Sequence, residues 1–512
     1  MRPVSLSSIR RYASRLPQMR IDPYEWLVLA FSLFALLPLA GPDYFFGAHD
    51  APHSVFFLTE FDAALRDGVW YPGWGTDHAF GYGWPTFVFY PPLAYYVAAG
   101  FHALGAGQVV AVKWTWALAT AAAGLAMYAY ARHVMGRKRA ALAAIVYVYV
   151  PYHLADIYVR AALAEYCAFV WMPLSLLAFH RLAERATARL IGLAALSYGA
   201  LWLTHNVTAL AFTPLLAAYV LFRILAEPGS ERDNRLVGWR DRFVRAAAAL
   251  AGALLGLGIA AALVLPNLLE RIYINQEQWV RASYDYALHF VFPFQLLSPF
   301  WGYGAAGPGP VDEMSFQLGA VPALLSLVAA VGAFWRPAKE RALALFVACA
   351  TVLVLFLMLP ASAPIWEMLS IAALVQFPWR LLALTTVTLA ILSGFAIPRA
   401  PDSNLDPRIL VLSLVAILGS YVYTLPELAS VPAGTDGLQL LLEFEAEYPD
   451  MKGMTAWTQE MPSTSPLVPQ YRSGAAPVAA EALAPGATVE LLRTAGASDL
   501  VTVQSENGTD LL

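Results

Sequence analysis

The chain has 512 residues, of which 59% are hydrophobic and only 13% are charged, with a mean hydropathy of +0.56. A soluble globular domain carries about 25% charged residues, so this composition excludes a soluble protein and indicates one embedded in a membrane. The formal net charge is -4 and the basic residues are scattered along the chain, which excludes a basic surface for nucleic acid. Both cysteines, Cys167 and Cys349, lie in apolar runs and are interpreted as small buried side chains without a disulfide.

Apolar stretches of roughly 16 to 23 residues recur along the chain and predict about eleven transmembrane helices. We expect them near residues 26–42, 109–131, 139–158, 166–182, 190–205, 207–224, 246–265, 317–335, 342–360, 381–397 and 409–426. The predicted fold class is therefore an all-α polytopic membrane protein. Its transmembrane domain covers residues 1–428, and a tail covers residues 429–512.

The distribution of basic residues predicts the orientation in the membrane. With the amino terminus in the cytoplasm, 23 of the 32 Lys and Arg are cytoplasmic, and nine lie outside or at the outer interface: Arg66, Lys113, Arg160, Arg271, Arg281, Arg380, Lys452, Arg472 and Arg493. Cytoplasmic loops are enriched in Lys and Arg, so this bias supports the orientation and the odd number of helices. We expect a multi-pass protein of a bacterial-type cytoplasmic (inner) membrane, with its carboxyl terminus outside.

Two outer regions are predicted to have structure of their own. The first loop, residues 43–108, contains an apolar stretch at 86–104, and we expect a helix there that lies in the outer interface. An extra crossing would place the basic turn Arg137–Arg139 outside. In the tail, residues 488–492 and 500–504 alternate as strands do, which predicts a small, mainly β segment outside the cytoplasm.

The first outer loop contains the strongest candidate for catalysis. Asp50 follows the first helix at the membrane surface, where partial desolvation can raise a carboxylate pKa toward that of a general base, and His49 and His53 flank it. Histidine and carboxylate groups can also bind a divalent metal, but no spacing such as H-E-x-x-H supports a site, so the cofactor stays unknown. The simpler interpretation is that polar residues keep the loop hydrated, which we favour for Asp62, Asp67 and Asp77.

Polar residues also follow the outer ends of later helices. Arg160 and Glu165 lie five residues apart in YVRAALAEY, where the arginine can bind a phosphate or form an interfacial salt bridge. Polar residues near the bilayer usually have partners or a function, so we expect one group of side chains at one membrane depth. Its further members are His205, Asn206, Arg271 and Arg380.

The order of these features resembles the GT-C fold of membrane sugar transferases, over about residues 25–180. The first helix is followed by Asp50, a long loop, Pro91-Pro92-Leu93 in YPPLAYY, and a second helix that ends in the basic turn GRKRAALAA. The segments GYGWPTFVFYPPLAYY, YVRAALAE, LTHN, QFPWR and MTAWTQEMP are similar, over nearly the whole chain, to bacterial membrane proteins called 6-pyruvoyl-tetrahydropterin synthase-related, a label that implies no pterin chemistry here.

The resemblance implies transfer of a sugar from a polyprenyl phosphate donor to a hydroxyl of a glycan, lipid or protein acceptor outside the cytoplasm. Asp50 is then the base, and Arg160, Arg271 and Arg380, with His205, neutralise the departing phosphate. His49, His53, Glu165 and Asn206 complete the expected substrate-binding set. The family often has Asp-Glu where this chain has Asp50-Ala51, and it has a larger tail domain, so we expect a shortened tail here.

Two other functions are consistent with the sequence. A transporter or lipid flippase places ionisable groups near the bilayer centre, and few such groups are found inside the predicted spans. A non-catalytic scaffold for envelope assembly retains the fold without the chemistry, and the missing acidic residue beside Asp50 is consistent with that function. In every case the lipid bilayer is a partner.

Overall fold

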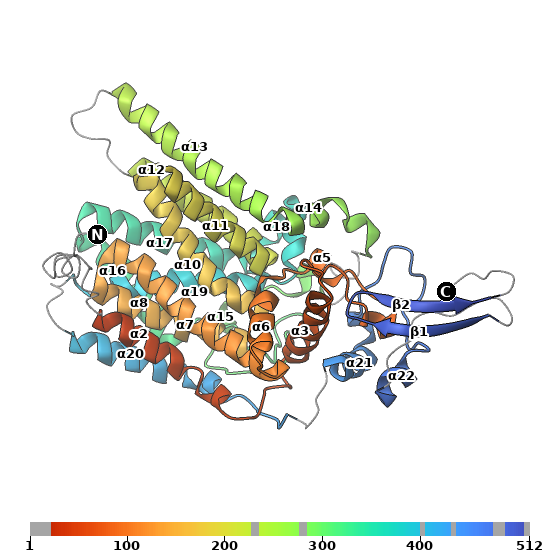
Figure 1. Cartoon of the computed structure of the whole chain (residues 1–512). Helices are drawn as coiled ribbons and strands as arrows, with labels where there is room; N and C mark the ends of the chain where they lie inside the picture. Colours follow the sequence, from red (N-terminus) through yellow and green to blue (C-terminus); the bar gives the residue numbers. More distant parts are fainter. Residues whose placement is uncertain are drawn as a thin grey trace, which may run out of the picture.

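The computed structural model describes residues 22–226, 235–275, 284–399, 405–431, 437–474 and 487–505. Within this part of the chain nearly all elements are helices, and the long ones lie side by side along one direction of the molecule (Figure 1). Both chain termini, whose sides of the membrane are predicted above, lie outside the described residues, and so does Arg281.

Four helices form the centre of the bundle: α7 (Gln108–Met135), α8 (Arg137–Tyr149), α10 (Leu163–Glu184) and α19 (Leu382–Phe395). α7 packs against α8 and α10, and α19 packs against α8. The segment Pro378–Phe395 is 94% buried, because it is apolar on all sides as a central helix must be. Small residues bring these backbones together, since a Cβ on Gly394 would lie 2.9 Å from the carbonyl oxygen of Arg139.

The remaining long helices surround this centre. α11 (Ala188–Thr204), α12 (Asn206–Ala226) and α13 (Arg235–Ile259) pack on α10 and on one another. α2 (Pro23–Phe34) and α20 (Pro407–Leu418) pack on α8, while α16 (Ala320–Gly332) and α17 (Ala338–Leu357) pack on α19, and α17 also contacts α12. Leu250, Leu254, Leu353 and Leu414 are exposed on these helices, as a surface that contacts lipid requires. Cys349 is also exposed on α17, so the prediction that both cysteines are buried is wrong for Cys349. An apolar run does not reveal which face of its helix meets lipid.

Six described helices are long and apolar enough to cross a membrane: Gln108–Met135, Leu163–Glu184, Asn206–Ala226, Gly238–Ile259, Ala338–Leu357 and Pro378–Phe395. α8 and α9 (Pro151–Tyr158), which are bent by 41°, form a seventh if they are one span. Four shorter apolar helices, Pro23–Phe34, Ala188–Thr204, Ala320–Trp335 and Pro407–Leu418, coincide with four further predicted spans. The chain is therefore a helical membrane protein, and the number of eleven crossings stays a prediction.

η1 (Leu37–Ala40) ends the first apolar stretch, and the first loop then folds into helices beside the bundle: α3 (Ala51–Arg66), α4 (His78–Gly81), α5 (Thr86–Phe89) and α6 (Leu93–Ala103). α6 packs against α7 and α3. It has 11 residues, whereas a membrane span needs about 20, so α6 by itself does not cross.

Short elements connect the later helices. They are α14 (Ala261–Leu269), η2 (Arg271–Tyr273), η5 (Tyr286–Leu288), α15 (Pro293–Leu296), η6 (Ala333–Trp335), η7 (Pro360–Ser362), α18 (Ala363–Met368), η8 (Ser370–Val375), η9 (Pro378–Leu381) and η10 (Tyr421–Thr424). Four of them, α15, η7, α18 and η9, contain proline in the first turn, where its fixed φ favours a helix start.

The tail contains both predicted strands. β1 (Thr488–Thr494) and β2 (Asp499–Gln504) form an antiparallel pair in which Thr488 lies opposite Gln504. The prediction of a mainly β tail is wrong, because the described tail also contains α21 (Gly437–Glu447), η11 (Pro449–Met451) and α22 (Val468–Ser473). Leu441 and Phe444 lie on one face of α21, at helical spacing, and pack on Phe56 of α3.

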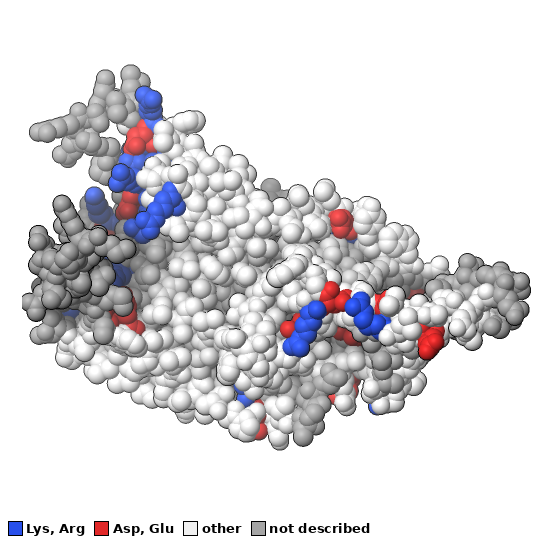
Figure 2. All heavy atoms as spheres, viewed as in Figure 1, with Lys and Arg blue, Asp and Glu red and all other residues white. Residues whose placement is uncertain are grey.

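Charged residues occupy the two ends of the bundle (Figure 2). Lys and Arg gather over the start of α13, and acidic and basic residues mix beside the tail, while the surface between them is almost uncharged. We call the first the basic end and the second the tail end. An uncharged band between two charged ends is the surface that a protein crossing a bilayer requires.

Candidate functional site

The site forms where the chain breaks between α9 and α10. Arg160 N–H donates to Ala155 O at 2.9 Å and Ala162 N–H donates to Asp156 O at 3.0 Å, which closes the end of α9. Ala161 adopts a left-handed conformation with φ of +50°, and this turns the chain toward α10. The break directs the Arg160 side chain into the protein, where the residue is only 4% exposed.

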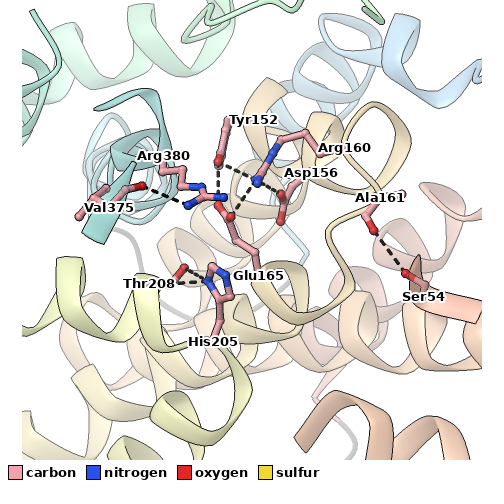
Figure 3. A network of polar contacts seen from close by, with 10 residues as sticks. All are labelled: Ser54, Tyr152, Asp156, Arg160, Ala161, Glu165, His205, Thr208, Val375 and Arg380. Atoms are coloured by element: carbon pink, nitrogen blue, oxygen red, sulfur yellow. Dashed lines mark hydrogen bonds and ion pairs between the residues drawn. The ribbon is translucent and has the colours of Figure 1, made fainter. Parts of the chain in front are cut away.

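Arg160 is held by two carboxylates and a phenol, as Figure 3 shows. Its Nη1 forms ion pairs with Asp156 and with Glu165, the latter at 2.8 Å, and donates to the Tyr152 hydroxyl at 3.0 Å. Tyr152 in turn donates to Glu165 Oε1 at 2.7 Å. A buried arginine needs such partners, because an unpaired charge in the interior is costly. The salt-bridge interpretation of Arg160 and Glu165 is thus confirmed in geometry.

Arg380 enters the same region from η9 but has neutral partners. Its Nη1 donates to Val375 O at 3.1 Å and to Gln376 Oε1 at 2.7 Å, and its guanidinium lies 4.9 Å from the Phe377 ring centre. Among the described residues no hydrogen-bond acceptor meets its buried Nε. The Trp379 ring lies near both arginines, with its centre 4.8 Å from the Arg160 guanidinium and 6.0 Å from that of Arg380. Arg380 is therefore a half-buried cation without a bound carboxylate in the described part of the chain.

His205 and Asn206 lie at the junction of α11 and α12. His205 is buried, and its Nδ1 accepts the Thr208 backbone N–H at 3.3 Å and contacts the Thr208 hydroxyl at 2.7 Å. Its Nε2 therefore carries the proton in the neutral ring. His205 and Glu165 interact electrostatically, which places His205 beside the network. Asn206 is half-buried and its Oδ1 accepts the Val207 N–H at 2.9 Å.

Asp50 lies beside this network at the N-cap position of α3. Its backbone N–H donates to Arg160 O at 2.8 Å, and the N–H of His49 donates to Val159 O at 3.1 Å. These bonds fix the first loop to the α9–α10 break. The Asp50 side chain is 43% exposed, and its charge acts on both Arg160 and Arg380. The structure thus places a solvent-accessible carboxylate next to a buried and a half-buried guanidinium group.

The two flanking histidines are neutral at pH 7. Burial lowers the pKa of both His49 and His53, and this effect outweighs the attraction of Asp50. His49 Nε2 donates to Gly304 O at 3.1 Å, which anchors the loop to a second outer segment. His53 Nδ1 lies 3.9 Å from Asp50 Oδ1. Among the described residues these groups do not form a cluster of three metal ligands around Asp50.

The structure thus brings together Asp50, Arg160, Glu165, His205 and Arg380, from five parts of the chain. Arg271 is exposed on η2, and the segment that follows pairs with the tail through Asn275 N–H and Met454 O at 2.9 Å. Its membership of the group at one membrane depth stays a prediction. A sequence does not show which outer helix ends face each other.

Three residues of the network were not predicted: Tyr152, Asp156 and Trp379. Tyr152, Asp156 and Arg160 are spaced four residues apart, which places them on one helix face. They follow Pro151, which begins a new helix bent from α8. The predicted span at 139–158 treated this segment as plain membrane interior, although Pro151 signalled the break.

The acidic residues of the first loop bind the tail. Asp77 Oδ1 accepts the Tyr471 hydroxyl at 2.7 Å and Asp67 Oδ2 accepts the Ser498 hydroxyl at 2.6 Å. Most specific is Glu445 of α21, which is buried and accepts the backbone N–H groups of Ala79 at 2.7 Å and Phe80 at 2.8 Å. The interpretation of Asp67 and Asp77 as merely hydrated is therefore wrong, since both connect the loop to the tail.

Comparisons with known proteins give only a remote likeness. No protein-family model matches the chain, and no curated protein matches it. Two structures of the Archaeoglobus fulgidus oligosaccharyltransferase, one in complex with Zn and sulfate and one tethered to an acceptor peptide with the NVT sequon, each match 78% of this chain, with 13% and 14% identity and TM-scores of 0.40 and 0.42. The matches cover 52% and 55% of those chains, so this chain spans about half their length. TM-scores of this size assign neither a fold nor an activity.

Proposed function

We propose that the chain is a membrane glycosyltransferase of the GT-C type, which transfers a sugar from a polyprenyl phosphate donor to an acceptor hydroxyl on the extracytoplasmic side. One observation carries the proposal: the accessible Asp50 carboxylate is fixed through its backbone N–H to Arg160 O, and its charge acts on the half-buried cation of Arg380. Transfer from a phosphate needs these two groups together, a base for the acceptor and a cation for the leaving group.

In the proposed reaction the acceptor oxygen attacks the anomeric carbon while Asp50 takes the hydroxyl proton. The bond between the anomeric carbon and the phosphate oxygen breaks, and its electron pair leaves with the polyprenyl phosphate. Negative charge grows on that phosphate in the transition state, so a preorganised cation stabilises the transition state more than the ground state. The displacement is direct and inverts the anomeric configuration.

The contacts assign different roles to the two arginines. Arg160 is already neutralised by Asp156 and Glu165, so it positions the site through its backbone contact with Asp50. Arg380 has neutral partners and a buried Nε without an acceptor among the described residues, so we assign it to the donor phosphate. His205 Nε2–H is a second donor for the same phosphate. Arg271 is not part of this proposal.

The proposed orientation places the tail end outside. Lys and Arg gather at the basic end (Figure 2), which the positive-inside rule assigns to the cytoplasm of a bacterial-type inner membrane. Asp50 and the tail then face the outer side. The polyprenyl chain lies in the bilayer, and a glycan, lipid or protein acceptor approaches from water.

The test is transfer by the purified protein in detergent, with a panel of radiolabelled polyprenyl phosphate sugars and membrane extract. We expect Asp50→Asn to lower the transfer rate by about 10²- to 10⁴-fold, the contribution of a general base. Asp43→Asn, in the same loop and seven residues away, is the matched control and retains the parental rate. A folded Asp50→Asn protein as active as the parent would reject the proposed base.

A transporter is the second candidate, and one observation favours it. α8 and α9 are bent by 41°, and the buried groups Asp156 and Arg160 follow the bend. Broken helices beside ionisable groups are typical of transporter binding sites. Movement of the polyprenyl phosphate sugar across vesicle membranes without any covalent product would support transport and reject the transferase.

A further inference from the structure

A second polar cluster lies at the opposite end of α10 from the Asp50 site. His180 and Glu184 belong to the last turns of α10, and His133 belongs to the last turn of α7. α10 has 22 residues and is therefore about 33 Å long, so Glu165 and Glu184 mark two separate sites. One ligand atom from each of the three residues can be chosen so that all lie within 4.8 Å of one another.

Helix packing explains why these side chains converge. His180 and Glu184 are four residues apart and therefore share one face of α10. α7 packs along α10 and delivers His133 to the same face. Glu184 is the shared partner, since its Oε2 lies 3.0 Å from His133 Nε2 and its Oε1 lies 3.2 Å from His180 Nε2.

The buried histidine is oriented by a hydrogen-bonded chain of tyrosines. His180 is 3% exposed, and its Nδ1 is hydrogen-bonded to the Tyr219 hydroxyl of α12. Tyr130 donates to the Tyr219 oxygen at 2.9 Å. This leaves His180 Nε2 directed at Glu184. Histidine ligands of metals are typically held in this way, with the second ring nitrogen bonded to a fixed partner.

We infer that His133, His180 and Glu184 form a binding site for a divalent transition-metal ion of the Zn²⁺ type. In a tetrahedral zinc site with Zn–N bonds of about 2.0 Å, neighbouring ligand atoms lie about 3.3 Å apart. The separations of 3.0 and 3.2 Å are close to this spacing but join the two histidines to different oxygens of Glu184, and one ligand atom from each of the three residues lies within 4.8 Å of the others. Two imidazoles and one carboxylate suit zinc, cobalt or nickel better than magnesium or calcium, which prefer oxygen ligands.

One neighbouring group opposes a cation. Arg223 Nη2 lies 3.9 Å from Glu184 Oε1 and repels any metal bound there. The site still suits a dication, because Glu184 and His133 are about one-third exposed and solvent screens the repulsion from Arg223. The same exposure lets a water molecule take the fourth coordination position. Since the ligands come from α7 and α10, and Tyr219 comes from α12, a bound metal holds three candidate spans together at the basic end.

The experiment uses the tag-free full chain in detergent, stripped with a chelator. Titration with ZnCl₂ by calorimetry is expected to show one ion per chain, and CoCl₂ is expected to give the visible absorption bands of a low-symmetry cobalt site. His133→Ala and Glu184→Gln change partly exposed side chains and are expected to weaken Zn²⁺ binding at least tenfold. His102→Ala is the matched control, because His102 Nδ1 lies 3.0 Å from Asp62 Oδ2 with Arg66 as the other neighbour.

Tyr219→Phe tests the orienting role. We expect Zn²⁺ to bind about 10- to 100-fold more weakly, with altered cobalt bands, while all three ligands remain. The melting temperature of each stripped variant checks its fold. Absence of stoichiometric Zn²⁺ binding by the parent, or parental affinity in both His133→Ala and Glu184→Gln, would overturn the site. Neither result depends on transferase activity.

Discussion

Arg160 is buried and Arg380 is half-buried, and we expect one to control the stability of the fold and the other the rate of transfer. Replacing Arg160 by Gln leaves Asp156 and Glu165 as buried carboxylates without their cation. We expect Arg160→Gln to destabilise the protein by about 3–5 kcal/mol, the usual cost of breaking a buried ion pair. Arg380→Gln leaves no such carboxylate among the described residues. We therefore expect this variant to have a melting temperature near that of the parent and to lose transferase activity.

Thermal unfolding in detergent and the transfer assay together check this difference. Gln376→Ala removes one neutral partner of Arg380 and is the control. Its melting temperature and its transfer rate should both stay close to those of the parent. Equal melting temperatures for the two arginine variants would contradict the assigned roles.

Glu60 makes the contact between loop and tail sensitive to pH. Burial, followed by the charges of Asp77 and Glu445, raises the pKa of Glu60 well above its ordinary value of 4.5. The folded state therefore favours protonated Glu60. Its stability contribution is fully present below pH 4.5 and is lost as the pH rises through the folded-state pKa. We expect Glu60→Gln to melt above the parent at alkaline pH and to approach it toward pH 4.5. Glu490→Gln, at an exposed position of β1, should melt like the parent throughout.

At the scale of helices, two glycines set the contact between α11 and α13. A Cβ on Gly199 would lie 2.8 Å from the carbonyl oxygen of Gly256, so the helices must separate to admit a methyl group. We expect Gly199→Ala to destabilise the protein by about 1–3 kcal/mol, as overpacking does. Gly192→Ala is the control on the same helix, because its Cβ would meet nothing within 4 Å. That variant should be neutral or stabilised by up to about 1 kcal/mol through helix propensity.

The existence of the helices could be predicted from the sequence, whereas their breaks could be predicted only in part. Every predicted apolar stretch contains a described helix, because burying backbone polar groups in lipid requires one. Pro151 signals the bend between α8 and α9, but the left-handed Ala161 depends on tertiary contacts, including Ser54 Oγ donating to Ala161 O at 3.4 Å. The sequence did not predict α21, because its apolar face is short and is buried only by packing on α3.

For the whole molecule, the charge distribution predicts which end faces the cytoplasm. In a background with Cys167→Ser and Cys349→Ser, we introduce Trp457→Cys in the tail or Trp239→Cys at the start of α13, both exposed positions. A membrane-impermeant maleimide applied to intact spheroplasts should label the first variant and not the second. Lysis should then make both react. The reverse pattern would contradict the orientation.

The site as a whole could be predicted only in part. Asp50, Arg160, Glu165, His205 and Arg380 were candidates by residue type and by position at helix ends. The last four lie together in Figure 3, and the charge of Asp50 acts on both arginines. The contacts between these side chains could not be predicted from the sequence, because they depend on which helices are neighbours in the fold. Asp156 decides the role of Arg160, yet it lies inside an apolar run and carries no motif.

The bonds from Glu445 to the backbone of Ala79 and Phe80 join residues 366 positions apart. At synthesis rates of about 5–20 residues per second, a ribosome needs roughly 20–70 s to make the intervening chain. In the proposed orientation, the first loop reaches the outer side before Glu445, the acceptor for its two N–H groups, has been synthesised. The contact between the first loop and the tail therefore forms among the last steps of biogenesis.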